Sequence, residues 1–172
     1  MAPSRQRRGQ QPSGKSADGG KPRTVRSFYQ ITDAPLDPEA LRAAIADPAS
    51  GAIATFVGVT RNSFAGKPVE HLEYEAYAPM AELEMERIGM EIAGLWPVVR
   101  GVAIAHRIGR VEVGEASVAI AISAPHRREA LAACAHGIDR LKATLPVWKK
   151  EVFADGSEWR ENREEEELDD GR

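Results

Sequence analysis

The chain contains one cysteine, Cys134, and this scarcity excludes two architectures that are common among small proteins. A disulfide within the chain needs two thiols, and a cysteine-based metal cluster needs several. Cys134 also falls on the apolar side of a predicted helix. We therefore expect a buried thiol and not a reactive nucleophile.

Patterns typical of metal and nucleotide sites are missing as well. The four histidines show no paired metal-ligand spacing, and no glycine-rich loop of the Walker type occurs. No Gly-x-Ser-x-Gly elbow marks a serine hydrolase. The sequence therefore favours neither a zinc enzyme nor an NTPase, and we expect no metal and no cofactor.

Long apolar runs are also lacking. None approaches the roughly 20 residues of a membrane span, and the N-terminus has no apolar signal segment. The net charge of -3 and the hydrophobic fraction of 42% are those of an ordinary soluble protein. We expect a cytoplasmic protein, and its 172 residues suit one domain with tails.

The two ends differ sharply from the middle in charge. Residues 1–26 hold seven basic residues against one acid, Asp18, and the end of the chain holds a run of glutamates and aspartates. Neither composition can build an apolar core. We predict a disordered basic extension over 1–26, a catalytic domain over 27–160 and a disordered acidic tail over 161–172.

Within that domain the apolar period changes repeatedly between two and 3.6 residues, which predicts an α+β or α/β fold. We predict strands at residues 28–31, 51–59, 72–76, 98–108 and 117–123, and a final hairpin over 147–160. We predict helices from Asp37-Pro38 to before Pro48, from Pro79 to before Pro97, and over 126–144. The expected core stripes are Ala81, Met85, Ile88, Ile92 and Leu95 on the second helix and Leu131, Cys134, Ile138 and Leu141 on the third.

The remaining expectations concern strand burial and a loop. The strand at 51–59 should be buried, residues 61–68 should form a polar loop, and Trp148 should anchor the final hairpin in the core.

Two lysines seven residues apart are the main indication of function. Lys142 should lie on the last turn of the third helix, and Lys149 follows shortly after Pro146, so both can face one pocket. The pKa of a lysine responds readily to burial and neighbouring charge, which suits proton transfer to or from an anionic substrate. The alternative is a solvated helix end, where lysines favourably face the negative end of the helix dipole.

Two further groups of cations follow predicted strands. His126 and Arg127 stand at the start of the third helix, where unpaired backbone N–H groups favour an anion such as phosphate. Arg61 opens the loop after the strand at 51–59. The alternative for His126 and Arg127 is a turn with no ligand.

Several separated motifs then make the chain recognisable. They are Thr55–Asn62, Leu72–Tyr77 with Pro79-Met80, His106–Gly109, Ser123–Arg127, Leu141-Lys142 and Pro146–Glu151. In this order they closely resemble the molybdopterin synthase catalytic (large) subunit family, over about residues 28–163.

The resemblance implies a single α+β domain of the α/β-hammerhead type, with an antiparallel or mixed sheet and packed helices. It implies a homodimer within a heterotetramer, in which each chain binds a small ubiquitin-like sulfur carrier that ends in a Gly-Gly thiocarboxylate. The implied activity is a sulfurtransferase that inserts two sulfurs into cyclic pyranopterin monophosphate to give molybdopterin. Because the only thiol is predicted to be buried and the printed sequence ends without Gly-Gly, we expect a separate protein to donate the sulfur.

The resemblance also assigns residues to roles. Catalysis falls to Lys142 and Lys149. The residues implied to bind substrate are Val59, Thr60, Arg61, His126, Arg127, Lys150 and Glu151.

Two other hypotheses remain open from the residues alone. One is a non-catalytic module that binds an anion or nucleic acid through the basic extension and the His126-Arg127 site, with an affinity that falls steeply with salt. The other is a lysine-dependent phosphate-handling enzyme that needs no protein donor.

Overall fold

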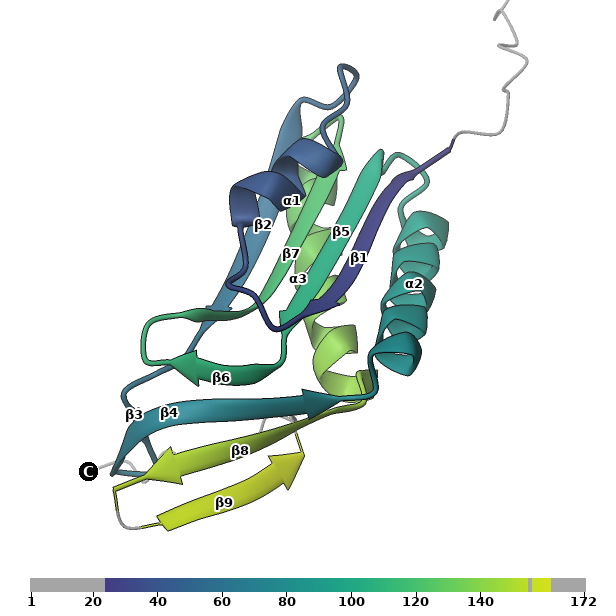
Figure 1. The fold of residues 1–172 in the computed structure, drawn as a ribbon. Coiled ribbons are helices and arrows are strands. Elements are labelled where there is room, and N and C mark those ends of the chain that lie inside the picture. Colours follow the sequence, from purple (N-terminus) through teal and green to yellow (C-terminus); the bar gives the residue numbers. More distant parts are fainter. Residues whose placement is uncertain (1–23, 155, 162–172) are drawn as a thin grey trace, which may run out of the picture.

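The computed structural model describes residues 24–154 and 156–161, which form two β-sheets and three helices (Figure 1). The predicted extension and tail lie, apart from residues 24–26 and 161, outside these residues. The α+β class predicted from the sequence is confirmed. Within the described residues, no helix is both long enough and apolar enough to cross a membrane.

The first sheet has four strands in the order β1 (Arg26–Thr32), β5 (Gly101–Arg107), β7 (Ala116–Ala124) and β2 (Ala52–Val59). β1 pairs with β5 in parallel, and the other two pairings are antiparallel. The central strands β5 and β7 are buried along almost their whole length. Their near-continuous apolar sequence is typical of strands that are covered on both faces.

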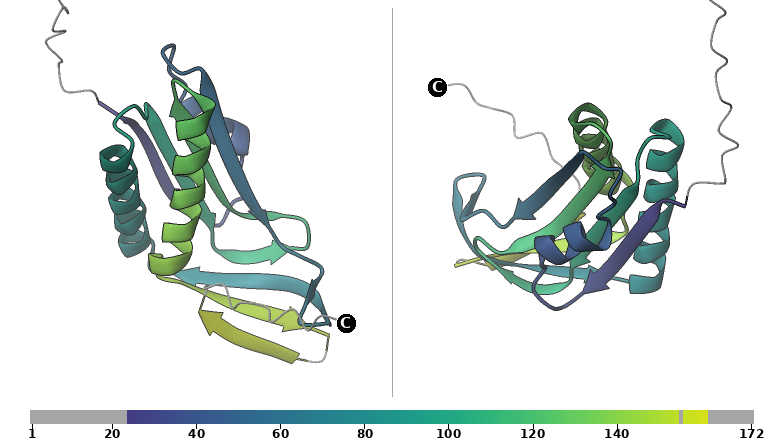
Figure 2. Two further views of the ribbon diagram at one scale, coloured as in Figure 1. Left: turned by 180° about the vertical axis from the view of Figure 1, so that it is seen from behind. Right: turned by 90° about the horizontal axis from the view of Figure 1, so that it is seen from above.

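Three helices cover the two faces of this sheet (Figure 2). α1 (Pro38–Ala44) lies on one face, and α2 (Ala78–Leu95) and α3 (Arg127–Thr144) lie on the other. On the α1 side the strands present alanines, which leave room for Leu41 and Ile45. On the α2–α3 side the alternate positions are Val102, Ile104, Ile120 and Ile122. This alternation decides which strand residues can reach α3.

Local chemistry explains where α1 begins. The carboxylate of Asp37 accepts hydrogen bonds from the backbone N–H groups of Glu39 and Ala40, at 2.9 and 3.2 Å, and Pro38 follows it. This N-cap with proline in the first turn is the signal that predicted the helix, and the prediction is confirmed.

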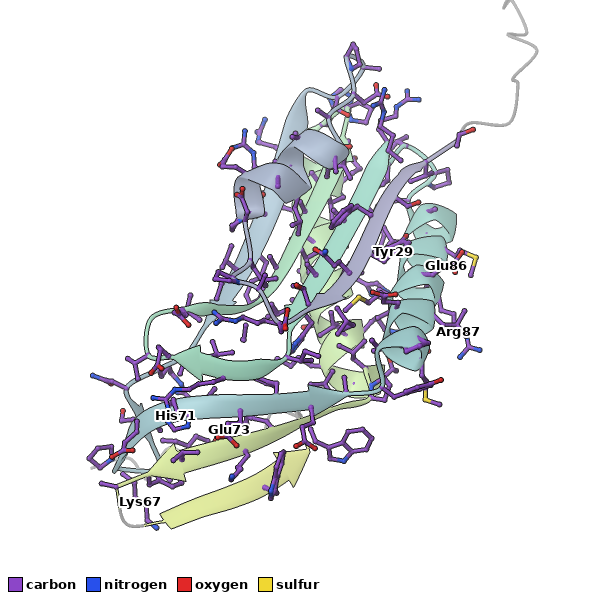
Figure 3. The ribbon with its side chains drawn as sticks, in the orientation of Figure 1. Tyr29, Lys67, His71, Glu73, Glu86 and Arg87 are labelled. Atoms are coloured by element: carbon purple, nitrogen blue, oxygen red, sulfur yellow. The ribbon has the colours of Figure 1, made fainter. Side chains whose placement is uncertain are left out.

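A close approach between Tyr29 and Gly89 joins β1 to α2. A Cβ built on Gly89 would lie 1.8 Å from the Tyr29 hydroxyl oxygen, so only glycine fits at that helix position. Figure 3 shows Tyr29 beside α2, with Glu86 on that helix. Burial, followed by the nearby Glu86 carboxylate, raises the pKa of Tyr29 to about 12.

The second sheet lies at one end of the first (Figure 1). Its path is β3 (Ser63–Phe64), β4 (Lys67–Ala76), β8 (Val147–Phe153) and β9 (Gly156–Glu161), and β6 (Gly109–Glu112) also pairs with β4. All of these pairings are antiparallel. The predicted final hairpin is confirmed as β8 and β9.

Two short strands were not predicted, because each is created by a turn. Ala65 and Gly66 have φ angles of 47° and 76°, and this turn folds β3 back onto β4 inside the segment predicted to be a loop. Gly109, with φ of 76°, separates β5 from β6, which begins just after the strand predicted over 98–108.

Some predictions of burial were wrong. Leu95, Leu131 and Trp148 are 56%, 61% and 49% exposed. On α3 the sheet is faced by small residues, Ala130, Ala133 and Gly137, which allow a close approach and turn Leu131 outward. On β8 the inward positions are taken by Val147 and the alternate residues after it, so Trp148 points away.

The strand at 51–59 was also predicted to be buried, and β2 is largely exposed from Thr55 to Val57 and at Val59. In the described chain β2 pairs only with β7, so it forms an edge of the first sheet. The apolar residues of β2 therefore lie on an edge strand that remains largely exposed.

Candidate active site

The candidate site lies where α3 meets the second sheet. α3 ends at Thr144, and β8 begins three residues later at Val147. Lys142 is in the last turn of that helix, and Lys149 is the third residue of that strand. Because this connection is short, both lysines lie at the end of the molecule where α3 ends and β8 begins. That both face one pocket stays a prediction.

Lys149 is held by a buried carboxylate. Its Nζ lies 2.8 Å from Oε1 of Glu151, whose side chain is only 2% exposed. Residues two apart on a strand share a face, which explains why this pair forms within β8. The ammonium also lies 5.4 Å from the centroid of the Phe64 ring, a cation–π contact supplied by β3.

The second carboxylate oxygen of Glu151 is a buried acceptor. Oε2 has no hydrogen-bond partner among the described residues. Leaving such an atom without a donor is costly, so this oxygen is suited to receive a hydrogen bond from a molecule that enters the site.

Lys142 lies at the border of the buried face of α3. It is half-buried, one residue after Leu141 and three before Leu145, both of which are buried. Its positive charge acts on His106, a buried histidine of β5. Burial is the main reason that the pKa of His106 falls to about 4, a hydrogen bond with the Arg107 carbonyl opposes the fall, and the charge of Lys142 adds to it.

Tyr74 links the surroundings of the two lysines. Its ring meets the His106 ring edge-on, with centroids 5.0 Å apart and an interplanar angle of 74°. In the β4–β8 register Tyr74 stands opposite Lys149. Burial and the charge of Glu151 raise the pKa of Tyr74, and a hydrogen bond with the Ser117 hydroxyl opposes them. The four residues Tyr74, His106, Ser117 and Glu151 are called the polar cluster below.

Lys150 is on the other face of β8. Its Nζ lies 3.0 Å from Oε2 of Glu73 on β4 and 5.5 Å from the ring centroid of Trp159. His71 contacts the same glutamate at 3.4 Å, and Figure 3 shows both His71 and Glu73 on β4. Lys150 hydrogen bonding is the first cause of the lowered pKa of Glu73. Within one chain, Lys150 is therefore separated from Lys149 and Glu151 by the sheet.

The residues after β2 reach the same end of the molecule as the lysines. β2 runs from Ala52, opposite Ala124, to Val59, opposite Ala116, and so it ends beside the start of β7. Thr60 is buried and Val59 is 54% exposed. Arg61 is exposed and lies three residues before Phe64, the ring beneath Lys149. Arg61 therefore lies at the same end of the molecule as the two lysines.

His126 and Arg127 are at the opposite end of α3. His126 is the N-cap and Arg127 the first residue of this 18-residue helix, and both are exposed. Fifteen residues separate Arg127 from Lys142, which corresponds to about 22 Å along a helix. One chain therefore does not bring this pair of cations together with the lysines.

Of the polar cluster behind the lysines, sequence reasoning gave a role in the site to Glu151 alone. His106 and Tyr74 stood inside motifs that supported the family resemblance, yet no role was given to either. The available signal was a histidine directly after the apolar run Val102–Ala105, where a polar side chain has to find a partner. The two residues meet where the two sheets join, since Tyr74 pairs opposite Gly109 of β6, three residues after His106, and the sequence does not display this pairing.

The fold and this site define a class of protein: a small α+β protein in which lysines lie next to buried titratable residues, Lys149 beside Glu151 and Lys142 near His106. The family model for the MoaE protein matches residues 31–144. The molybdopterin synthase catalytic subunit of Nostoc sp. is 50% identical over 137 residues, which cover 80% of this chain and 82% of the relative.

Solved structures agree with this. A crystal structure of molybdopterin synthase from Staphylococcus aureus is 40% identical, covers 77% of this chain and 96% of its own, and has a TM-score of 0.74. A complex of subunits 1 and 2 of the molybdopterin-converting factor from Helicobacter pylori is 21% identical, covers 81% of this chain and 92% of its own, and shares the fold with a TM-score of 0.63.

The chain belongs to the MoaE family of molybdopterin synthase catalytic subunits. This membership gives it an enzymatic role in molybdopterin synthesis and disfavours the non-catalytic module. The resemblance inferred from the motifs is thereby confirmed.

Proposed function

We propose that this chain inserts two sulfurs into cyclic pyranopterin monophosphate, taking them from the C-terminal thiocarboxylate of a small ubiquitin-like partner. In each transfer the donor carbon exchanges its sulfur for an oxygen and ends as a carboxylate, so nothing is oxidised or reduced. One water opens the cyclic phosphate. The tasks left to the protein are to hold two anions together and to move protons.

The observation that supports this proposal most strongly is Lys149 held over the buried carboxylate of Glu151. A fixed ammonium stabilises negative charge that develops during sulfur transfer, and its position costs no reorganisation at that moment. Lys142, at the same end of the molecule, provides a second amine. We assign proton transfer and charge stabilisation to these two lysines.

The state of the only cysteine supports an external sulfur donor. Cys134 is 6% exposed, and burial raises the pKa of its thiol. The thiolate is the form that carries and transfers sulfur, so this residue is unsuited to the task. The complex of two subunits known for the Helicobacter pylori protein is consistent with a separate donor chain.

We further propose that a second copy of this chain supplies His126 and Arg127 to the lysines of the first. Their distance along α3 prevents them from joining the lysines of their own chain. In a two-fold dimer each copy would contribute its His126 and Arg127 to the lysines of the other, so two equivalent sites would form. The exposed apolar residues of β2, including Phe56 and Val59, suit such a contact.

The decisive experiment incubates the chain with the cyclic substrate and thiocarboxylated donor and measures the dithiolene product. Lys142→Ala and Lys149→Ala should each abolish product formation, while Arg87→Ala removes an exposed cation from α2 and should leave it intact. Normal turnover by either lysine variant would refute the assignment of the lysines.

Mixing variants tests the contribution of the second copy. Arg127→Ala and Lys149→Ala chains, each inactive alone, should recover product formation when they are mixed and allowed to exchange partners. The heterodimer then contains one site with both residues intact. Mixtures that exchange partners but stay inactive would show that Arg127 does not act across the dimer.

A further inference from the structure

His106 lies on β5 of the first sheet, on the face that α2 and α3 cover. On β5 it has the same parity as Val102 and Ile104, the positions that face α2 and α3. It is 1% exposed. A buried histidine on an apolar strand is often only a packed ring, so the orientation of its two nitrogens decides whether it does more.

The hydrogen bond at Nδ1 fixes the orientation. Nδ1 lies 2.8 Å from the carbonyl oxygen of Arg107, and a carbonyl can only accept. Nδ1 therefore carries the hydrogen. In the neutral ring, Nε2 then has a lone pair and acts only as an acceptor.

Neighbouring polar groups of the two sheets and of α2 have partners of their own among the described residues. Tyr74 of β4 presents its ring edge, and its hydroxyl interacts with Ser117 of β7. Glu151 of β8 accepts, and its partner is Lys149. On the β1 side, Glu82 of α2 is occupied by the backbone N–H of Ile31, at 2.9 Å.

Lys142 is the cation whose charge reaches His106. Its ammonium has three donors and no acceptor, which is the complement of a nitrogen that only accepts. Both groups lie at the junction of α3, the first sheet and the second sheet. Arg107, the next residue on β5, pairs with Glu115 at 2.8 Å and so has a different partner.

We propose that His106 is a positioning residue for Lys142: Nε2 accepts a hydrogen bond from Nζ and holds the amine toward the substrate. The long side chain of a lysine loses rotamer freedom when its end is fixed, and a fixed amine reacts more effectively than a mobile one. With one N–H directed at His106, the remaining bonds of Nζ point away from the sheet. This orientation suits Lys142 both as a proton donor and as a proton acceptor toward the substrate.

This inference rests on the proposed function of Lys142, and it adds the residue that orients it. A pair of amide variants separates the two nitrogens of the ring. His106→Gln places an amide oxygen near the position of Nε2 and preserves the acceptor for Lys142. His106→Asn places its amide near Nδ1 and preserves the donor to the Arg107 carbonyl, but it cannot reach Lys142.

Turnover with substrate and thiocarboxylated donor is the first measurement. We expect His106→Asn to lower kcat by roughly 10- to 100-fold with KM little changed, because misplacement of a reacting group by about 1 Å costs up to about 100-fold. His106→Gln should recover most of the loss. Equal losses in both variants, or better activity in His106→Asn, would show that only the Arg107 contact matters and overturn the proposal.

A spectroscopic measurement works without turnover. In histidine labelled with ¹⁵N, the wild-type His106 should show a protonated Nδ1 and an unprotonated Nε2 shifted by a hydrogen bond. Lys142→Met should move the Nε2 resonance further from that of the protonated nitrogen, and Arg87→Met should not. An unchanged Nε2 resonance in Lys142→Met overturns the inference, whether or not the wild type makes product. A wild type that makes no dithiolene while the resonance does move refutes the proposed function alone.

Discussion

The ion pair between Lys149 and Glu151 permits a quantitative test of how the site is built. We consider Lys149→Met, which keeps the length and the apolar stem of the side chain and removes its charge. Two unit charges 2.8 Å apart attract by about 6 kcal/mol at an effective dielectric constant near 20. That gross attraction offsets the desolvation of both groups, so the net contribution of the pair is much smaller.

Breaking the pair from one side is the costly change. Glu151 is 2% exposed, and in Lys149→Met it stays buried without its cation. Removing one partner of a buried pair costs about 3–5 kcal/mol, and we expect a loss of this size in the free energy of unfolding. Glu151→Gln should cost less, because the Lys149 side chain is 17% exposed and its ammonium has a route to water.

The double variant Lys149→Met/Glu151→Gln completes the cycle. With neither charge present, it should be more stable than Lys149→Met alone, and the coupling between the two positions should be at least about 2 kcal/mol. Urea denaturation of the four proteins at neutral pH, followed by circular dichroism, measures these differences. If the two single losses simply add, the pair does not interact as described and the picture of a fixed ammonium fails.

Three further predictions concern other parts of the molecule. Gly89→Ala should destabilise the protein by about 1–3 kcal/mol despite the better helix propensity of alanine, because its Cβ meets the Tyr29 hydroxyl. The double variant Tyr29→Phe/Gly89→Ala should recover part of the loss. Thermal unfolding measures both changes, and no loss in Gly89→Ala would contradict the contact. His106 is neutral in the folded protein down to about pH 4 but takes up a proton in the unfolded chain below about pH 6.5, so its pKa differs between the two states. Falling pH in this window should therefore lower the free energy of unfolding by up to about 1.4 kcal/mol per pH unit. Denaturation at several pH values should show a weaker dependence of stability on pH in His106→Gln, and an identical dependence would assign the effect to other groups. Asp37→Ala should cost about 1 kcal/mol through loss of the α1 N-cap, with Asp37→Asn close to wild type in the same denaturation assay, and equal losses in both would argue against the cap.

The sequence determined the local elements well where a strong chemical signal was present. Asp37 and Pro38 marked the start of α1, and the prolines near residues 79 and 97 bounded α2. Hydrophobic periodicity gave the class of fold, and the separated motifs gave the family. The prediction failed where one side of an element is open, as at Leu131 and along β2, because periodicity reports which face is apolar and not which face is covered.

The composition of the site was determined only in part by the sequence. Lys142 and Lys149 were found because a short, proline-containing connection keeps them near each other in space as well as along the chain. Strand alternation places Lys149 and Lys150 on opposite faces, but only the tertiary structure shows that Lys149 faces the buried Glu151 and that Lys150 pairs with Glu73. The side of a strand that becomes the inside depends on what packs against it.

The helix predicted over 126–144 already separates Arg127 from Lys142 by its length, and the structure confirms this helix as α3. Our proposal that His126 and Arg127 serve the site of a second chain rests on that length. Tertiary structure alone decided the other feature on which the proposed mechanism depends. His106 and Tyr74, 32 residues apart in sequence, meet behind the lysines where the two sheets join, because Tyr74 of β4 pairs opposite Gly109 of β6, three residues after His106. A sequence fixes chemistry residue by residue, whereas distances between remote residues arise from the packing of whole helices and sheets.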